Sequence, residues 1–113
     1  MKSRAYSPNR GDLVWIDFSP QAGHEQAGRR PALVVSPGAY NKKVGLAIFC
    51  PITSQVKGYP FEVALPLGPP IQGVVLSDQA KSLDWRARRV DYAGAAPQNV
   101  TIEVVKKLAT LLQ

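Results

Sequence analysis

Residues 12–18 read Asp-Leu-Val-Trp-Ile-Asp-Phe, a run dense in β-branched and aromatic side chains. Alternate residues from Val14 to Phe18 fall on one face of an extended chain, and Leu13 and Trp15 fall on the other. This alternation predicts a β-strand. Because similar short apolar runs recur along the sequence, the stretch points to a mainly β chain.

The later strands are each bounded by proline or glycine. Pro31 restricts the chain just before the second strand, and Pro51 within the third indicates an edge position or a bend. A short turn or helical piece is expected over residues 40–43. The predicted strands after the first cover residues 32–36, 46–53, 61–65, 73–77 and 82–90.

The spacing of apolar residues changes after Pro97. Val100, Val104 and Leu108 recur at helical intervals, which predicts a C-terminal helix of about 15 residues beginning at the proline. Short strands followed by one helix favour a small, strongly bent β-barrel. At 113 residues the chain is expected to form a single domain.

Composition narrows the classes of partner and compartment. Fourteen Lys and Arg against eight Asp and Glu give a net charge of +6, which favours a polyanion such as nucleic acid or an acidic protein segment. The lone cysteine, Cys50, excludes an intrachain disulfide and is interpreted as a buried thiol. No apolar stretch approaches the roughly 20 residues that cross a bilayer, so we expect a cytoplasmic protein without a membrane partner.

Several chemistries are excluded by counting residues. One histidine and one cysteine cannot form the usual zinc site, nor a two-histidine ribonuclease mechanism within one chain. The carboxylates are scattered singly, which argues against a two-metal nuclease. No phosphate-binding glycine motif joins a strand to a helix. We therefore expect metal-independent chemistry with no cofactor.

The polar segment 23–31 is the candidate reactive loop. Glu25 could take a proton from a ribose 2′-hydroxyl, and Arg30 could stabilise the charge of a phosphorane. The alternative is a solvated surface ion pair between Glu25 and Arg29, which composition alone favours. His24 is a candidate acid, or simply an exposed histidine.

Three further segments offer groups for nucleic acid. Residues 51–55 end a strand in hydroxyl and amide groups, and residues 57–60 combine a lysine with a tyrosine, as single-strand binders do. The latter segment could equally be a hairpin turn with a solvated lysine. Residues 78–81 lead into the basic segment 85–89, in which Trp85 is expected to belong to the core.

Together and in this order, these segments resemble the MazF (PemK-like) family of endoribonuclease toxins of type II toxin–antitoxin systems. The matching stretches are residues 11–18, 25–31, 57–63 and 78–82 with 85–88. The resemblance implies an SH3-like, PemK/CcdB-like β-barrel with a C-terminal helix that forms a homodimer. It also implies sequence-specific, metal-independent cleavage of single-stranded mRNA, leaving 2′,3′-cyclic phosphate and 5′-hydroxyl ends and inhibiting translation and growth.

The resemblance also implies roles for individual residues. Glu25 would be the base, Arg30 would stabilise the phosphorane and Thr53 would contact the scissile phosphate. His24 stands where close relatives commonly have serine, and is an auxiliary candidate. The expected RNA-binding residues are Arg29, Lys57, Gln79, Lys81, Arg86 and Arg88.

A toxin of this kind would be neutralised by a cognate antitoxin with a flexible acidic segment, because such a chain can wrap a basic groove and fold on it. The alternative function is a non-catalytic barrel that binds RNA or poisons a protein target such as DNA gyrase. The basic segments would serve either role.

Overall fold

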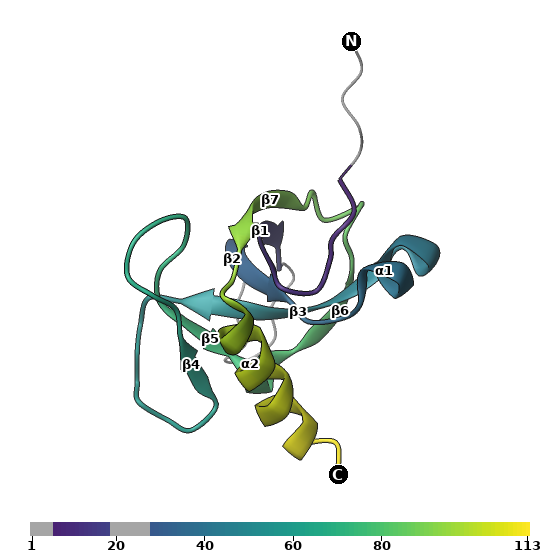
Figure 1. Ribbon diagram of the computed structural model, residues 1–113. Coiled ribbons are helices and arrows are strands. Elements are labelled where there is room, and N and C mark those ends of the chain that lie inside the picture. The colour runs from purple at the N-terminus through teal and green to yellow at the C-terminus, as the bar shows by residue number, and fades with distance from the viewer. Residues whose placement is uncertain (1–5, 19–27) are drawn as a thin grey trace.

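A computed structural model describes residues 6–18 and 28–113, to which all structural statements below refer. Strands dominate, and α2 lies at the C-terminal end (Figure 1). The elements are β1 (Asp12–Asp17), β2 (Arg29–Val34), α1 (Gly38–Val44), β3 (Leu46–Thr53), β4 (Glu62–Ala64), β5 (Val74–Leu76), the 3-10 helix η1 (Ser77–Gln79), β6 (Lys81–Asp84), β7 (Asp91–Ala95) and α2 (Gln98–Thr110). The expectation of a mainly β fold with a C-terminal helix is confirmed.

The strands form one antiparallel seven-stranded sheet. Its order is β4-β5-β3-β2-β1-β7, and β6 pairs with β3 off this path. Among the described strands, β4 and β7 do not pair with each other, so the sheet is open, and its curvature is consistent with a barrel-like fold.

Strand β3 is the centre of the sheet. One edge pairs with β2, while the other pairs with β6 up to Phe49 and with β5 from Ile52 onward. Pro51 lies between the segments that pair with β6 and with β5. On that edge of β3, its missing N–H therefore removes no hydrogen bond between strands. Of the two alternatives that Pro51 suggested, an edge position is therefore wrong.

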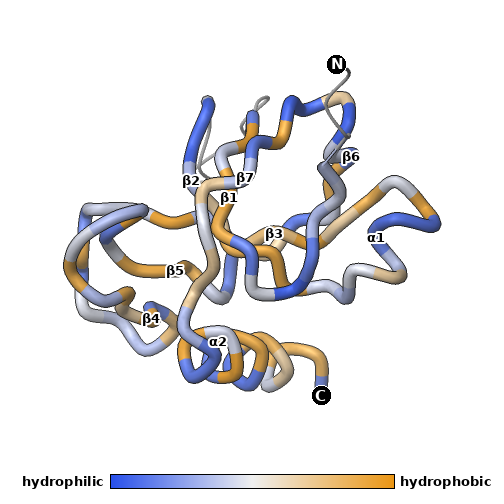
Figure 2. Tube along the Cα trace, turned by 45° about the horizontal axis from the view of Figure 1, so that its top comes forward, coloured by the Kyte–Doolittle hydropathy of each residue, from blue (hydrophilic) through white to orange (hydrophobic). Residues whose placement is uncertain are grey.

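The two faces of β1 enter two different apolar cores, as the alternation predicts. Leu13 packs with Leu33 and with the buried face of α2, including Val104. Val14 and Phe18 belong to the second core, on the other side of the sheet. Figure 2 shows α2 lying along one side of the sheet, with hydrophobic and hydrophilic residues alternating around its turns.

The strand predicted over residues 82–90 is correct only as far as Asp84, where β6 ends and a turn follows. The Asp84 carboxylate accepts the backbone N–H groups of Arg86 and Ala87, both at 3.1 Å, which closes the turn. Trp85 is buried as expected, and its Nε1 donates to the Asn41 carbonyl at 3.1 Å. The chain then forms β7, which the sequence did not predict.

Strand β2 begins at Arg29, three residues earlier than expected. Arg29, Arg30 and Pro31 pair with Asp17, Ile16 and Trp15 of β1.

The β1–β2 hairpin therefore extends to the ends of segment 19–27, where the Phe18 N–H donates to the Gly28 carbonyl at 2.8 Å. This extension moves both arginines from a loop onto a strand.

Candidate functional site

Two open pockets meet at Thr53, the last residue of β3. The first, called here the η1 pocket, has a volume of about 430 Å³. The second, the β2 pocket, has a volume of about 310 Å³. The η1 pocket is lined by Thr53, Gln55, Lys57, Tyr59, Glu62, Leu76, Asp78, Gln79, Ala80 and Lys81. The β2 pocket is lined by Trp15, Arg30, Pro31, Ile52, Thr53, Ser54, Pro70, Ile71 and Gln72.

Thr53 is held in place by its backbone neighbours. It pairs with Val74 at the start of β5, and its Oγ1 accepts the Gln55 N–H at 3.1 Å. Gly73 has a φ of +123°, and a Cβ there would overlap the Thr53 carbonyl oxygen and lie 2.9 Å from its carbonyl carbon. Only glycine fits this close approach. The hydroxyl group at the junction of the pockets thus has a fixed position.

The β2 pocket is lined by both Arg30 and Thr53, two of the three residues predicted to be catalytic. Arg30 is half-buried on β2, opposite Ile16. Trp15, whose partner on β2 is Pro31, lines the same pocket with 40% of its surface exposed. Arg30, Thr53 and Trp15 therefore line one hollow, a set of residue types that suits an anion next to an aromatic base.

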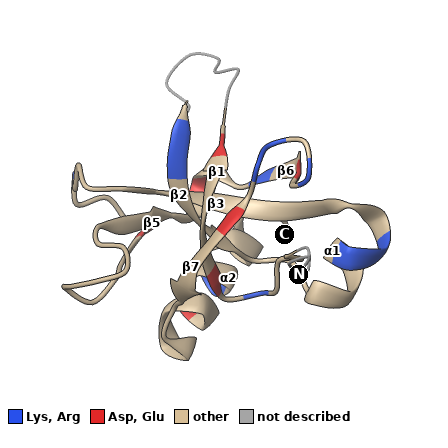
Figure 3. Cartoon of the chain, turned by 90° about the horizontal axis from the view of Figure 1, so that it is seen from above, with Lys and Arg blue, Asp and Glu red and all other residues tan. Residues whose placement is uncertain are grey.

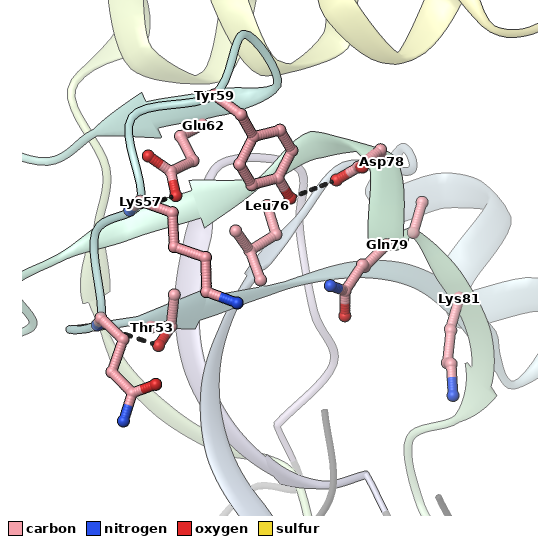
Figure 4. A pocket seen from close by; sticks show the side chains of 10 residues that line it. Thr53, Lys57, Tyr59, Glu62, Leu76, Asp78, Gln79 and Lys81 are labelled. Atoms are coloured by element: carbon pink, nitrogen blue, oxygen red, sulfur yellow. Dashed lines mark hydrogen bonds between the residues drawn. The ribbon is translucent and has the colours of Figure 1, made fainter. Parts of the chain in front are cut away.

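The η1 pocket gathers three of the predicted RNA-binding residues, Lys57, Gln79 and Lys81. In Figure 4 the Lys57 ammonium and the Gln79 amide point toward each other across the pocket. The pocket thus presents two cations and an amide next to Thr53. This is a donor set that suits a phosphodiester chain.

The turn that carries Lys57 is closed by Glu62. Its two carboxylate oxygens accept the backbone N–H groups of Lys57 and Gly58 at 2.9 and 2.8 Å. The segment 57–60 is therefore a turn, and its lysine also lines a pocket. Among the described strands β4 pairs with β5 and not with β3, so this turn does not close a hairpin, and the binding of RNA by Lys57 stays a prediction.

Tyr59 and Asp78 form a pair on the wall of the η1 pocket. The Tyr59 hydroxyl donates to Asp78 Oδ1 at 2.9 Å (Figure 4). Burial first, and then this hydrogen bond to a carboxylate, raise the pKa of Tyr59 to about 12. Tyr59 therefore keeps its proton at neutral pH and remains a donor to Asp78.

Arg29 lies outside both pockets. Its Nη1 is 3.1 Å from Asp17 Oδ1, and its Nη2 pairs with Asp91. Arg89 Nε also reaches Asp17, at 3.1 Å, and these two guanidinium contacts, the one from Arg89 first, hold the pKa of Asp17 below its usual range. In Figure 3 the acidic end of β1, the basic start of β2 and the acidic residue of β7 lie at one end of the sheet. Arg29 thus fastens strands together.

The other two predicted arginines, Arg86 and Arg88, lie on the β6–β7 turn. The Arg86 guanidinium stacks over the Trp85 ring, 4.5 Å from its centroid. Arg88 Nη1 donates to the Asp17 carbonyl at 3.2 Å. Neither lines the η1 or the β2 pocket, so the structure separates them from the residues around Thr53.

Two further predicted residues, His24 and Glu25, lie outside the described residues. Among residues 6–18 and 28–113, no group of three or more His, Cys, Asp or Glu side chains could hold a metal ion. Trp15 was not predicted as a site residue, because the alternation of the first strand placed it on the same face as Leu13.

Comparisons with known proteins agree over nearly the whole chain. Residues 9–112 match the family described as PemK-like, MazF-like toxin of type II toxin-antitoxin system. The endoribonuclease toxin MazF of Escherichia coli K12 is 51% identical over 98 residues, covering 86% of this chain and 87% of the relative.

Two solved structures from Deinococcus radiodurans are similar as well. MazF in one crystal form has 57% identity and a TM-score of 0.91, with 96% of this chain and 98% of that chain covered. A MazE–MazF structure has 57% identity and a TM-score of 0.85, with 96% and 97% covered. In the part of the chain that the structure describes, no helix is long and apolar enough to cross a membrane.

Proposed function

The chain belongs to the PemK-like, MazF-like toxins of type II toxin–antitoxin systems, and from this we propose that it is an endoribonuclease that cuts single-stranded mRNA. The observation that supports the proposal best is the meeting of Arg30 and Thr53 in the β2 pocket, directly beside the η1 pocket with its lysines. RNA would lie across both pockets, with the scissile phosphate at Thr53.

The proposed cleavage needs three groups. Glu25 takes the proton of the 2′-hydroxyl, and the 2′-oxygen attacks the phosphorus to give a five-coordinate phosphorane. Arg30 stabilises the negative charge on its oxygens. Thr53 already accepts a backbone N–H, so its O–H proton is the one to donate to a phosphate oxygen.

Collapse of the phosphorane breaks the bond to the 5′-oxygen, which leaves as a hydroxyl after taking a proton. His24 is the auxiliary candidate for this proton transfer. The products are a 2′,3′-cyclic phosphate and a 5′-hydroxyl end, and no step uses a metal ion. Lys57, Gln79 and Lys81 would hold the RNA on the η1 side.

The partners follow from the same family membership. We propose that two copies form a homodimer, that a cognate antitoxin covers the two pockets with an acidic flexible segment, and that the toxin acts on mRNA in the cytoplasm. The MazE–MazF structure from D. radiodurans supports the pairing of toxin and antitoxin.

Cleavage mapping by primer extension on a long RNA in chelator tests the proposal. Arg30→Ala and Glu25→Ala should each lose about 100-fold or more in cleavage rate, since each removes a group that acts in the transition state. Lys43→Ala removes one positive charge from exposed helix α1, outside both pockets, and should cut as the parent does. Equal cleavage by all three variants would show that the site is misassigned.

The non-catalytic alternative has its own signature in this experiment. Tight binding of RNA or of a protein target by the parent, without any cut ends in chelator, would favour that alternative. Growth arrest measured beside cleavage separates the two, because a non-catalytic poison would arrest growth while leaving the RNA intact.

A further inference from the structure

The η1 pocket contains a carboxylate that phosphate binding does not explain. Lys57 and Lys81 suit the RNA backbone, but Glu62 and Asp78 line the same walls. A carboxylate placed among phosphates is repulsive, and it contributes to RNA recognition only by accepting hydrogen bonds from a base edge. The question is which of the two is placed to do this.

Glu62 is committed to the backbone. Each of its oxygens accepts an N–H of the turn that carries Lys57. Its exchange for another residue would release that turn, so its role is to shape the pocket.

Asp78 is placed differently. It is exposed and is the second residue of η1. Its Oδ1 accepts a hydrogen bond from the Tyr59 hydroxyl. A carboxylate has about four acceptor positions on its two oxygens, and this bond uses one of them. The Tyr59 bond therefore fixes the direction of the carboxylate and leaves acceptor capacity for a ligand.

The neighbours of Asp78 suit a nucleobase. Tyr59 contributes a half-buried aromatic ring, and Gln79, the next residue, contributes an amide that points into the pocket (Figure 4). Stacking on an aromatic ring is tolerant of sequence, whereas hydrogen bonds to a base edge discriminate. Tyr59, Asp78 and Gln79 together form a wall with one stacking surface and two hydrogen-bonding groups.

We propose that Asp78, oriented by Tyr59, reads one base of the RNA by accepting hydrogen bonds from its exocyclic amino group, and so excludes uridine at that position. Adenine, cytosine and guanine each carry an amino group. Uracil has none, and its single N–H lies between two carbonyl oxygens that repel a carboxylate. This inference rests on the proposed function and adds a specificity-determining residue to it.

The experiment is cleavage of an RNA pool randomised around the cut site, read by sequencing the ends. The parent should disfavour uridine at one position by about tenfold, as expected for loss of one good contact to a base. Asp78→Asn should reduce that preference to about twofold or less, because the amide N–H can donate to a uracil carbonyl while the amide oxygen can still accept from an amino group.

Two further variants isolate the cause. Glu103→Gln removes the same charge from exposed α2, outside both pockets, and should keep the uridine preference unchanged. Tyr59→Phe keeps the Asp78 charge but removes the bond that directs it, so the preference should weaken. It serves as the second test should Asp78→Asn fold poorly by thermal unfolding.

The outcomes separate this inference from the proposed function. A parent that cuts with no position depleted in uridine, or Asp78→Asn and Tyr59→Phe that slow all RNAs equally with the base profile unchanged, would overturn the base-reading role alone. A parent that cuts no RNA would overturn the proposed function and this inference together.

Discussion

Replacing Gly73 with alanine should disable the site by moving the backbone of Thr53. Gly73 has a φ of +123°, and the new methyl group would overlap the Thr53 carbonyl oxygen and lie 2.9 Å from its carbonyl carbon. Carbon atoms in ordinary contact lie about 3.5–4.0 Å apart, so β3 and β5 must separate by roughly 0.5–1 Å. Thr53 pairs with Val74, the residue next to Gly73, and takes up that movement.

The magnitude has two parts. Holding a residue with a side chain at positive φ costs about 1–2 kcal/mol, and forcing extra atoms into a packed position costs about 1–3 kcal/mol more. We expect Gly73→Ala to lower the free energy of unfolding by about 2–5 kcal/mol. A misplacement of about 1 Å at a reacting group can lower the rate about 100-fold.

Gly68→Ala is the matched control. Gly68 also has a positive φ, +107°, but a Cβ there would meet nothing within 4 Å. It should lose only the conformational part, about 1–2 kcal/mol, and keep its cleavage rate.

Urea unfolding and the rate of cleavage of one RNA, measured at a temperature where both variants are folded, provide the comparison. Equal stability of the two variants, with equal cleavage, would refute the argument that Gly73 positions Thr53.

Trp85→Phe should lower the free energy of unfolding by about 1–3 kcal/mol in urea titrations, because it removes the indole hydrogen bond to the Asn41 carbonyl, which keeps only the Gly45 N–H, and leaves part of the buried indole volume unfilled; an unchanged midpoint would contradict this. Asp17→Asn tests the ion pairs to Arg29 and Arg89. The pKa of Asp17 is lowered on folding, so its contribution is present above the unfolded value of 3.8 and is lost as pH falls through the lower folded value. The difference in thermal midpoint between parent and variant should therefore be constant from pH 5 to 7 and shrink toward pH 2, and a difference that grew on acidification would contradict the pairing. Burial raises the pKa of the Cys50 thiol to about 12, so mass spectrometry should find it unmodified by iodoacetamide at pH 8 in the native protein and modified in denaturant, whereas rapid native labelling would contradict its burial.

The local pattern of apolar residues was sufficient to predict an element whose buried residues alternate along a strand or follow one face of a helix. The period-2 run from Val14 to Phe18 and the helical spacing of Val100 and Val104 both identify their elements correctly. Local pattern failed over residues 85–90, beyond the end of β6. The alternation of Leu83 and Trp85 is typical of a strand. The Asp84 carboxylate instead closes a turn after β6, and the Trp85 indole is buried although it lies on that turn.

The site shows the same division. Residue types and their order indicated Arg30, Thr53, Lys57, Gln79 and Lys81, and the structure gathers these around two adjoining pockets. Nothing in the order of residues showed that Gly73 must be glycine, because its neighbour Thr53 lies 20 positions earlier and approaches it only through the pairing of β3 with β5.

The adjacent arginines show most clearly what each level determined. The sequence by itself placed Arg29 and Arg30 before Pro31, and made both candidates for an anion. Only the tertiary structure separated them, because strand pairing brings Asp17 and Asp91 beside Arg29 but not beside Arg30. Arg30 lines the pocket beside Thr53, whereas Arg29 meets Asp17 and Asp91. Composition and local period specify which groups are present, but long-range strand pairing decides which of them face the same hollow.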